Sequence, residues 1–407
     1  MLSLERYRML DLSRMFPGPF TSHVLADLGM EVIRVEEPEP RYGMPRDTLS
    51  PLNHTPELEE RYAAYNAVSR NKKSIALNLV DPGKRPQCQE IFYRLAQRAD
   101  VVLDGYRPGT LEWMGVDYET VKAYNPRIIY CCLTGFGHTG PYARRPGHGG
   151  QFEALGGTMR LDGEGVPVGA GLALGDLSGA LHATTSILAA LLHREHTGEG
   201  QFIDVSLSAA AMALAVSNAA QLARGDPRPP QAARGTNALS LLKCKDGKWL
   251  STGNAETIFW EAFCKALGRP EWIPLRRTQG PETEKMVKEV QKIFLTKSRD
   301  EWLEILVKAD TCVAPVNDIE AALQDPHMRQ IGMVWEMEHP KMGTITQTGF
   351  PVRFSGKPVP PGSFGPVLGQ HTREILKEEG YSQAQIAELE QQGVVESWES
   401  LLQKSQK

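Results

Sequence analysis

Short apolar runs alternate with helical stretches through the first third of the chain, and this alternation restricts the fold more than any other feature. Strands that take turns with helices are typical of a parallel α/β sheet. The sequence predicts a first strand at Leu10 and Leu12, a helix over 17–29, and strands within 31–38, 74–79, 100–104 and 127–133. We therefore expect an α/β fold with a Rossmann-type sheet in this part of the chain.

The loop after the first predicted strand lacks the signature of a dinucleotide site. Dinucleotide-binding sheets carry G-x-G-x-x-G there, because the glycines let the backbone approach a pyrophosphate. This chain instead reads FPGPFTSHVLADLG. A nicotinamide or flavin cofactor is therefore not expected, whereas a different ligand that carries a nucleotide stays open.

Length and charge set broad limits on the kind of protein. A chain of 407 residues exceeds what one hydrophobic core usually serves, so two or three domains are expected. The formal net charge is -4, and 23% of the residues are charged. Neither value indicates a surface that binds nucleic acid, and any anionic ligand must be held by local basic residues.

Membrane, disulfide and metal signals are weak. The amino end, MLSLERYRML, lacks the apolar core of a signal peptide, and the most apolar segment, 205–223, is too polar to span a bilayer. That segment is expected to be a packed helix in a cytoplasmic protein without a membrane partner. The six cysteines show neither CxxC nor Cys/His spacing, so the sequence predicts reduced thiols without a disulfide framework or a metal site.

Composition changes suggest where the domains divide. The stretch RGDPRPPQAARGTN at 224–237 is typical of a linker or exposed loop. After it, a hairpin is expected to turn at Asp246-Gly247, followed by helices in 255–268 and 299–310. Residues 339–369 should be extended, and 381–406 helical. We assign 1–200 to a large Rossmann-like domain, 201–228 to a linker helix and loop, 229–330 to a small α+β domain, and 331–407 to a return linker and the last part of the large domain.

The stretch from Pro146 to Asp204 carries the clearest chemical signal. Asp176 stands between an apolar run and the first turn of a long predicted helix, and His148 precedes it by about thirty positions. A helix amino terminus stabilises an ionised carboxylate, which can then act as a nucleophile or a base. An aspartate at this position also commonly caps the helix, so the residues alone leave capping and catalysis open.

Several motifs together carry a resemblance to a known family. They are LADLGMEVIRVEEP, SRNKKSIALNL, DGYRPGTLEWMGVDYETV, NPRIIYCCLTGFGHTGPY, the GD of LALGDLSG, and LAALLHREHTGEGQFIDVSL. In this order they resemble the family III CoA-transferases of the CaiB/BaiF type, a family that also includes the α-methylacyl-CoA racemases. The resemblance implies an interlocked dimer. It also implies that both chain ends form the large Rossmann-like domain, with the small α+β domain inserted between them.

In such transferases the residue at the position of Asp176 attacks a donor thioester. The resemblance thus implies a mixed anhydride on Asp176, then an aspartyl-CoA thioester, from which an acceptor carboxylate takes CoA. A donor such as succinyl-CoA and a larger dicarboxylate acceptor such as benzylsuccinate would fit. Formyl or oxalyl chemistry is not expected, because the glycine-rich loop of the oxalate enzymes is missing from the small domain. No permanently bound cofactor is expected, since the CoA thioester is a substrate.

Two other activities stay open. The racemases of the family use a Gly-His pair and an aspartate as bases and a small-domain glutamate as partner of the histidine, which match Gly147-His148, Asp176 and Glu256. However, their pattern continues His-Asp where this chain has Gly149, and the segment GDLSG is closer to the transferases. A non-catalytic subunit of a heteromeric transferase is the third possibility, so the resemblance allows either a homodimer or a heteromer with a related subunit.

The phosphates of CoA require cations and backbone donors. Arg107, in the RPG context, matches a CoA-contacting arginine of the family. Further candidates are Arg34, Arg70, Lys72, Lys73 and the backbone at Gly137, although a run such as RNKKS is also common in solvated loops. Relatives often carry a basic residue where this chain has Glu37, and Arg41 could replace it.

Overall fold

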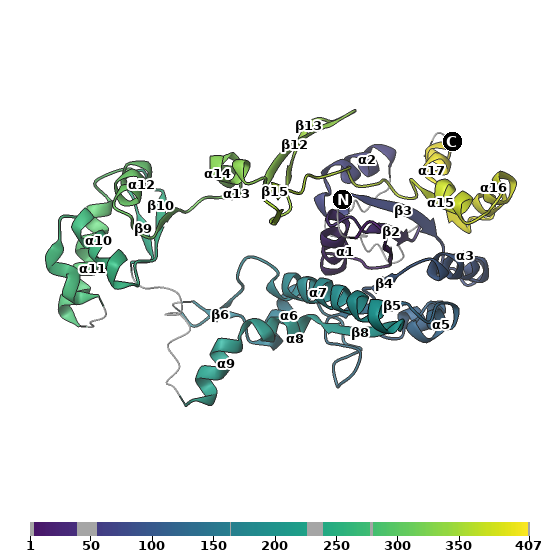
Figure 1. The fold of residues 1–407 in the computed structure, drawn as a ribbon, viewed down its shortest axis with the longest axis horizontal. Coiled ribbons are helices and arrows are strands. Elements are labelled where there is room, and N and C mark those ends of the chain that lie inside the picture. Colours follow the sequence, from purple (N-terminus) through teal and green to yellow (C-terminus); the bar gives the residue numbers. More distant parts are fainter. Residues whose placement is uncertain (1–3, 39–54, 163, 226–238, 277–279, 406–407) are drawn as a thin grey trace. The chain divides into compact units, whose positions relative to one another are not determined.

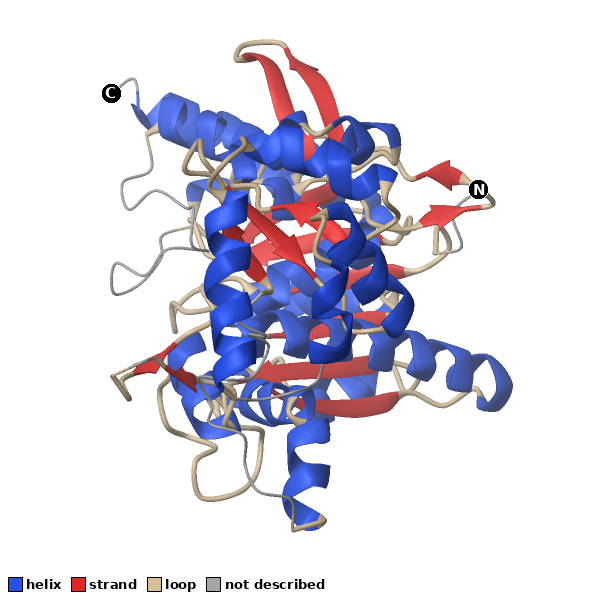
Figure 2. Ribbon diagram, turned by 90° about the vertical axis from the view of Figure 1, so that its left-hand side faces the viewer, coloured by secondary structure: helices blue, strands red, loops and turns tan. Residues whose placement is uncertain are grey.

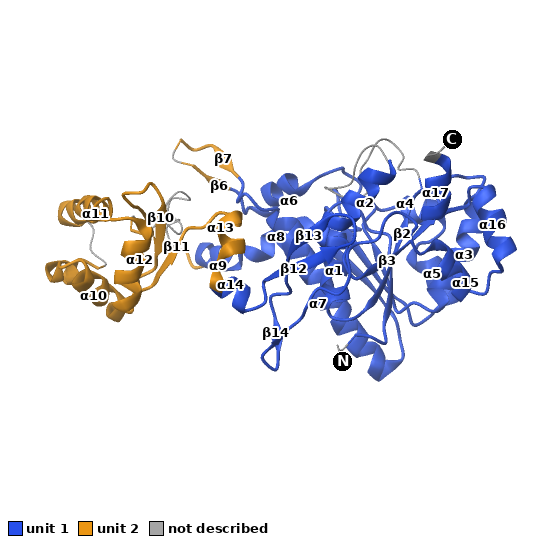
Figure 3. Cartoon of the chain, turned by 90° about the horizontal axis from the view of Figure 1, so that it is seen from above, with its two compact units in different colours: residues 1–159, 169–223, 327–407 blue, residues 160–168, 224–326 orange. Residues whose placement is uncertain are grey.

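The fold is taken from a computed structural model that describes residues 4–38, 55–162, 164–225, 239–276 and 280–405. Two compact units divide the chain (Figure 3). Unit 1 comprises residues 1–159, 169–223 and 327–407, and unit 2 comprises 160–168 and 224–326. Both chain ends therefore contribute to unit 1. Arg41 lies outside the described residues.

Unit 1 is built on a seven-stranded sheet in the order β16-β3-β2-β1-β4-β5-β8 (Figure 1). Its strands are β1 (Arg8–Asp11), β2 (Glu31–Glu36), β3 (Lys72–Leu77), β4 (Val101–Asp104), β5 (Ile129–Thr134), β8 (Gln201–Ser206) and β16 (Val395–Glu396). All pairs are parallel except β16 with β3. The six parallel strands have the Rossmann order, which confirms the predicted sheet.

Helices cover both faces of this sheet (Figure 2). One face packs on α1 (Pro17–Asp27), α6 (Gly149–Gly156), α7 (Leu174–Thr197) and α8 (Leu207–Leu214). The other packs on α3 (Arg85–Gln97), α4 (Thr110–Met114), α5 (Tyr118–Tyr124), α15 (Thr372–Glu378) and α16 (Gln383–Gln391). Because successive residues of a strand face opposite ways, neighbours such as Cys131 and Cys132 lie in different hydrophobic clusters.

Two predicted helices are broken in the structure. The helix expected over 381–406 is α16 followed by β16 and α17 (Trp398–Ser405), because Gly393 takes a left-handed φ of 66° and Val395 then pairs with Leu77 at the sheet edge. The packed helix expected in 205–223 is two helices, α8 and α9 (Val216–Ala223), and α9 buries none of its residues. No helix among the described residues is long and apolar enough to cross a membrane.

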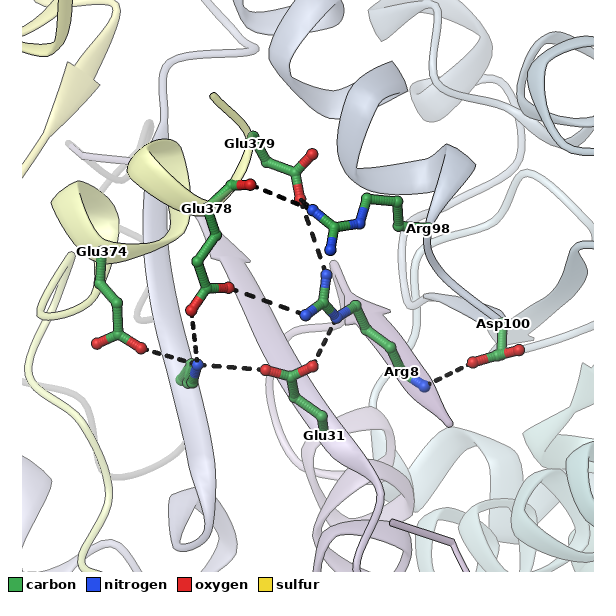
Figure 4. A network of polar contacts seen from close by, with 8 residues as sticks. Arg8, Glu31, Arg98, Asp100, Glu374, Glu378 and Glu379 are labelled. Atoms are coloured by element: carbon green, nitrogen blue, oxygen red, sulfur yellow. Dashed lines mark hydrogen bonds and ion pairs between the residues drawn. The ribbon is translucent and has the colours of Figure 1, made fainter. Parts of the chain in front are cut away.

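Ion pairs attach helix α15, in the C-terminal part of the chain, to the amino ends of the sheet strands (Figure 4). Arg8 on β1 donates to Glu31 on β2 at 2.6 Å and lies 3.8 Å from Glu379, just after α15. Arg98 also meets Glu379, at 3.1 Å. Each surface ion pair of this kind contributes little to the free energy of unfolding. Together they fix where the C-terminal part of the chain packs against the sheet.

Residues 339–369 are mostly extended, as predicted. Further elements lie outside the seven-stranded sheet and its covering helices. They include the hairpin β12 (Val334–His339) with β13 (Gly343–Thr348), the short pair β14 (Arg353–Phe354) with β15 (Lys357–Pro358), α14 (Pro326–Gln330), α2 (Pro56–Tyr65) and the 3-10 turn η2 (Ala67–Ser69).

Unit 2 has its own hydrophobic cluster around a three-stranded sheet, β11-β10-β9. The predicted hairpin is confirmed, since β9 (Leu241–Lys243) pairs antiparallel with β10 (Trp249–Thr252) and Gly247 turns with a φ of 81°. The two predicted helices are also confirmed, as α10 (Thr257–Ala266) and α12 (Arg299–Lys308). The unit also contains β6 (Arg160–Leu161), β7 (Pro167–Val168), η4 (Pro270–Leu275), α11 (Pro281–Phe294), β11 (Val313–Pro315) and α13 (Ile319–Gln324).

Candidate active site

Asp176 lies in the first turn of α7, as its sequence context predicts, and its residue is only 9% exposed. Its Oδ1 is buried without a hydrogen-bond partner among the described residues. The pKa of Asp176 is raised to about 6, first by burial and then by the nearby Glu153 carboxylate, while His148 acts in the opposite direction. The N-cap of α7 is Ala173, so Asp176 is not the N-cap residue of this helix, and its carboxylate is available for chemistry.

The start of helix α6 approaches this carboxylate closely. His148 is the N-cap of α6, and its backbone N–H donates to Gln151 Oε1 at 2.9 Å. A Cβ on the next residue, Gly149, would stand 3.3 Å from Asp176 Oδ2 and 3.4 Å from Ala173 Cβ. A side chain at Gly149 would thus crowd the carboxylate, and its absence leaves the α6 backbone beside Asp176.

Glu153 is a member of the site that the sequence reasoning missed. This buried residue of α6 accepts a hydrogen bond from the backbone N–H of Leu174, at the start of α7, at 3.0 Å. The contact ties the two helix starts together and places a second carboxylate near Asp176. Its spacing in the sequence could have indicated this position, because Glu153 follows Gly149 by four residues and therefore lies on the same face of the helix.

Glycines allow α6, α7 and α8 to pack closely. A Cβ on Gly179 would lie 2.4 Å from Leu207 Cδ2, and one on Gly156 would lie 2.6 Å from Ala211 Cβ. A Cβ on Gly175, next to Asp176, would lie 3.2 Å from Phe152 Cβ, a tight contact that a small movement of Phe152 would relieve. Real Cβ atoms essentially never approach within 3.0 Å, so Gly156 and Gly179 are required for this close packing.

Glu256, the predicted partner of His148, belongs to unit 2. It is the N-cap of α10 and is exposed, and its side chain makes no capping hydrogen bond to the described helix. Its pairing with His148 stays a prediction.

The loops after β1 and β4 meet where the strand order reverses. In open α/β sheets this crevice, at the carboxyl ends of the strands, is where ligands bind. The Arg14 guanidinium lies 5.6 Å from the centre of the Tyr106 ring, and Tyr106 donates to Glu37 Oε1 at 3.0 Å. Arg14 and Glu37 are also 3.5 Å apart. Glu37, which departs from the family pattern, is therefore paired inside the protein, and the adjacent Arg107 is exposed.

The other predicted phosphate-binding cations have partners within unit 1. Arg70 is buried against the Asp27 carboxylate, with Nε 3.0 Å from Oδ1, and also donates to the Thr348 carbonyl. Lys72 is buried and donates to the Pro19 carbonyl at 2.9 Å. The remaining contacts are Lys72 to Ser22 at 2.7 Å, Arg34 to Ser69 at 2.8 Å and to Glu36 at 3.1 Å, and Lys73 to Glu374 at 2.8 Å and to Glu31 at 3.2 Å. CoA binding by these four side chains stays a prediction.

Gly137, predicted to offer its backbone, has a left-handed φ of 86° in the loop after β5. Its N–H donates to Thr134 Oγ1 at 3.0 Å. A separate cavity beyond the carboxyl ends of β2 and β3 is lined by Lys84 and Lys404 among others. The sequence reasoning did not select these two lysines, which lie far apart in the sequence.

Comparison with known proteins assigns the family. The model of CoA-transferase family III matches residues 4–372. The chain belongs to CoA-transferase family III. The resemblance expected from the sequence motifs is thereby confirmed, and the protein is a CoA-transferase.

Relatives and solved structures within CoA-transferase family III agree over nearly the whole chain. Succinyl-CoA:glutarate CoA-transferase from Mus musculus is 35% identical over 98% of this chain and 92% of its own. Formyl-CoA:oxalate CoA-transferase from Escherichia coli is 31% identical over 95% of this chain and 98% of its own. The crystal structure of a CAIB/BAIF family protein from Brucella suis superposes with a TM-score of 0.75 at 28% identity, covering 93% of this chain and 99% of the other.

Proposed function

We propose that the protein transfers CoA between carboxylic acids with Asp176 as the nucleophile. One carboxylate oxygen attacks the thioester carbon of an acyl-CoA, the C–S bond breaks, and a mixed anhydride and the CoA thiolate form. The thiolate then attacks the Asp176 carbonyl, which releases the donor acid and leaves an aspartyl-CoA thioester. The acceptor carboxylate attacks this thioester, and the returning thiolate takes the acceptor acyl group and regenerates Asp176.

The observation that carries this proposal is the buried Asp176 carboxylate beside the start of α6, one oxygen of which has no hydrogen-bond partner in the described ranges. Desolvation keeps water from competing with the acceptor, and the amino terminus of α7 favours the ionised form. The first N–H groups of a helix have no acceptor within the helix. We assign the N–H groups of Gly149 and Gly150 the role of stabilising the oxyanion of each tetrahedral intermediate.

For substrates, we propose succinyl-CoA as donor and a dicarboxylate as acceptor. The mouse relative is named for succinyl-CoA and glutarate, which makes glutarate the first acceptor to test. A bulkier acid of the benzylsuccinate type stays a prediction. The relative named for formyl-CoA and oxalate makes that pair the necessary comparison, because the absence of the glycine-rich loop predicts poor activity with it.

For the CoA moiety, we propose that Arg107 contacts a phosphate. Its guanidinium is exposed at the carboxyl ends of the strands, where a nucleotide is expected in this fold. The lysines Lys84 and Lys404 line a cavity at the same edge of the sheet and would suit a second phosphate.

Trapping of the acyl-enzyme tests the mechanism. After incubation with succinyl-CoA and a quench with hydroxylamine or borohydride, peptide mass spectrometry should find the modification at Asp176. Asp176→Asn keeps the size of the side chain but is not a nucleophile, so it should lose activity by at least about 1,000-fold and show no modification. Modification elsewhere, or a variant with near-normal turnover, would refute the role of Asp176.

Epimerisation of an α-methylacyl-CoA is a second candidate function, favoured by the charge interaction between His148 and Asp176. Two bases near one α-carbon could remove a proton and return it on the other face. Entry of solvent deuterium at the α-carbon, abolished by His148→Gln, would support epimerisation. Acyl transfer without such exchange would exclude it.

A further inference from the structure

Three side chains with metal-binding atoms meet at the carboxyl ends of β4 and β5. They are Asp104 at the end of β4, Cys132 on β5 and His138 in the loop after β5. One ligand atom from each lies within 4.8 Å of the other two. Asp104 and Cys132 are buried, so this cluster differs from the exposed acidic groups that are common on protein surfaces.

The register of the sheet brings the first two together. Asp104 and Cys132 are direct partners in the parallel pair of β4 and β5, so their side chains leave the sheet on the same face. Cys132 Sγ lies 3.4 Å from Asp104 Oδ2. The neighbouring Cys131 points to the opposite face, into the cluster that includes residues of α7.

The third member is positioned by its backbone, and one ring nitrogen, Nε2, has no hydrogen-bond partner within the described part of the chain. The His138 N–H donates to both oxygens of Asp204, at 3.1 and 2.9 Å, and the ring lies edge-on to Phe202 at 5.4 Å. Its Nε2 is buried without a hydrogen-bond partner among the described residues. A buried, unpaired ring nitrogen near a thiol and a carboxylate requires an explanation, and a bound ion supplies one.

We propose that Asp104, Cys132 and His138 bind a divalent transition metal, with Zn²⁺ the best match. Zn²⁺ binds thiolate, imidazole and carboxylate together at about 2.0–2.3 Å, which places the ligand atoms of one tetrahedral site about 3.5 Å apart. The sulfur and carboxylate already have this spacing, and His138, whose ring nitrogen lies within 4.8 Å of both, reaches it through a small shift of its loop. Three protein ligands leave a fourth position for water or a small ligand.

The site shares no side chain with the groups assigned to acyl transfer. Asp104 and Cys132 leave the sheet on the face opposite to the one that packs against α7. Binding would fix the loop after β5, whose Gly137 has a left-handed backbone, against the ends of β4 and β5. Metal should therefore raise the melting temperature of the protein, by an amount that grows with the logarithm of the metal concentration over its dissociation constant.

Cobalt substitution tests the proposal on the full chain. After treatment with a chelator, titration with Co²⁺ should give one equivalent per chain, with visible bands of tetrahedral Co²⁺ and a thiolate-to-metal charge-transfer band. Cys132→Ser should remove the charge-transfer band, whereas Cys131→Ser, the matched control on the same strand, should keep it. His138→Gln, at a partly exposed position where folding is not at risk, should weaken Zn²⁺ binding by at least about 10-fold.

The outcomes separate clearly. The site would be supported if the wild type binds one equivalent of metal, Cys132→Ser loses the charge-transfer band and His138→Gln binds Zn²⁺ more weakly. The rise in melting temperature caused by Zn²⁺ should also disappear in both variants. A charge-transfer band that survives in Cys132→Ser, Zn²⁺ affinity unchanged in His138→Gln, or no binding to the folded wild-type protein would overturn it. None of these readouts depends on catalytic activity.

Discussion

At the scale of single residues, the site depends on how a buried carboxylate is kept reactive. Burial lifts the pKa of Asp176 to about 6, so the group is ionised at neutral pH, while desolvation leaves it a stronger nucleophile than a hydrated carboxylate. Glu153 raises the pKa of Asp176 as well, and it does so while holding the Leu174 N–H. An amide at position 153 would keep the hydrogen bond and remove the charge.

Glu153→Gln should therefore shift the pH profile of transfer to lower pH. With a pKa near 6 for Asp176, the wild type at pH 5 should retain about a tenth of its plateau kcat/KM, because only the ionised form reacts. Removing the neighbouring negative charge lowers the pKa of Asp176, so this fraction should rise roughly twofold or more. Glu199→Gln, at an exposed position, is the control and should leave the profile unchanged. If the decrease of kcat/KM at acidic pH occurs at the same pH in Glu153→Gln as in the wild type, the Glu153 charge does not affect the pKa of Asp176.

At the scale of elements, the site is a junction of helices whose spacing is set by glycines. A Cβ on Gly156 would lie 2.6 Å from Ala211 Cβ and 2.9 Å from two backbone atoms of α8, so the helices would have to separate. Movement of α6 would carry His148 and Gly149 away from Asp176, and the geometry of the site would change although no reacting residue is altered.

Gly156→Ala should accordingly reduce both stability and activity. Alanine favours a helix by about 1 kcal/mol over glycine, but the forced separation should cost about 1–3 kcal/mol and outweigh that gain. Urea denaturation and kcat/KM measure the two effects. Gly83→Ala is the control, since its Cβ would come no closer than 3.4 Å to a flexible side chain. Equal or higher stability in Gly156→Ala would show that α6 and α8 can adjust without loss.

At the scale of the whole molecule, α8 and α9 leave apolar side chains in solvent. Met212 is 64% exposed and Val216 68%, and α9 buries no residue within the chain. Large apolar side chains exposed on neighbouring helices often mark a contact with another protein. A second copy of the chain, interlocked with the first as the family resemblance implies, is the partner we expect.

An interlocked homodimer makes a kinetic prediction. Light scattering should give twice the mass of the chain, and a mixture of tagged and untagged protein should form hybrids only after unfolding and refolding, because linked chains cannot separate while folded. Native mass spectrometry measures the hybrid fraction. Rapid exchange under native conditions would indicate an ordinary dimer, and a monomer would contradict the assembly altogether.

The sequence alone determined the order and type of most elements, since hydrophobic periodicity and turn residues act over a few neighbours. It also placed Asp176 at a helix start and indicated the family. Contacts between distant segments were decided by the tertiary structure: Glu153 beside Asp176, Arg70 against Asp27, and Asp104 opposite Cys132. The physical reason is that such contacts depend on strand order, register and helix spacing. These are set by packing of the whole unit, and no local pattern encodes them.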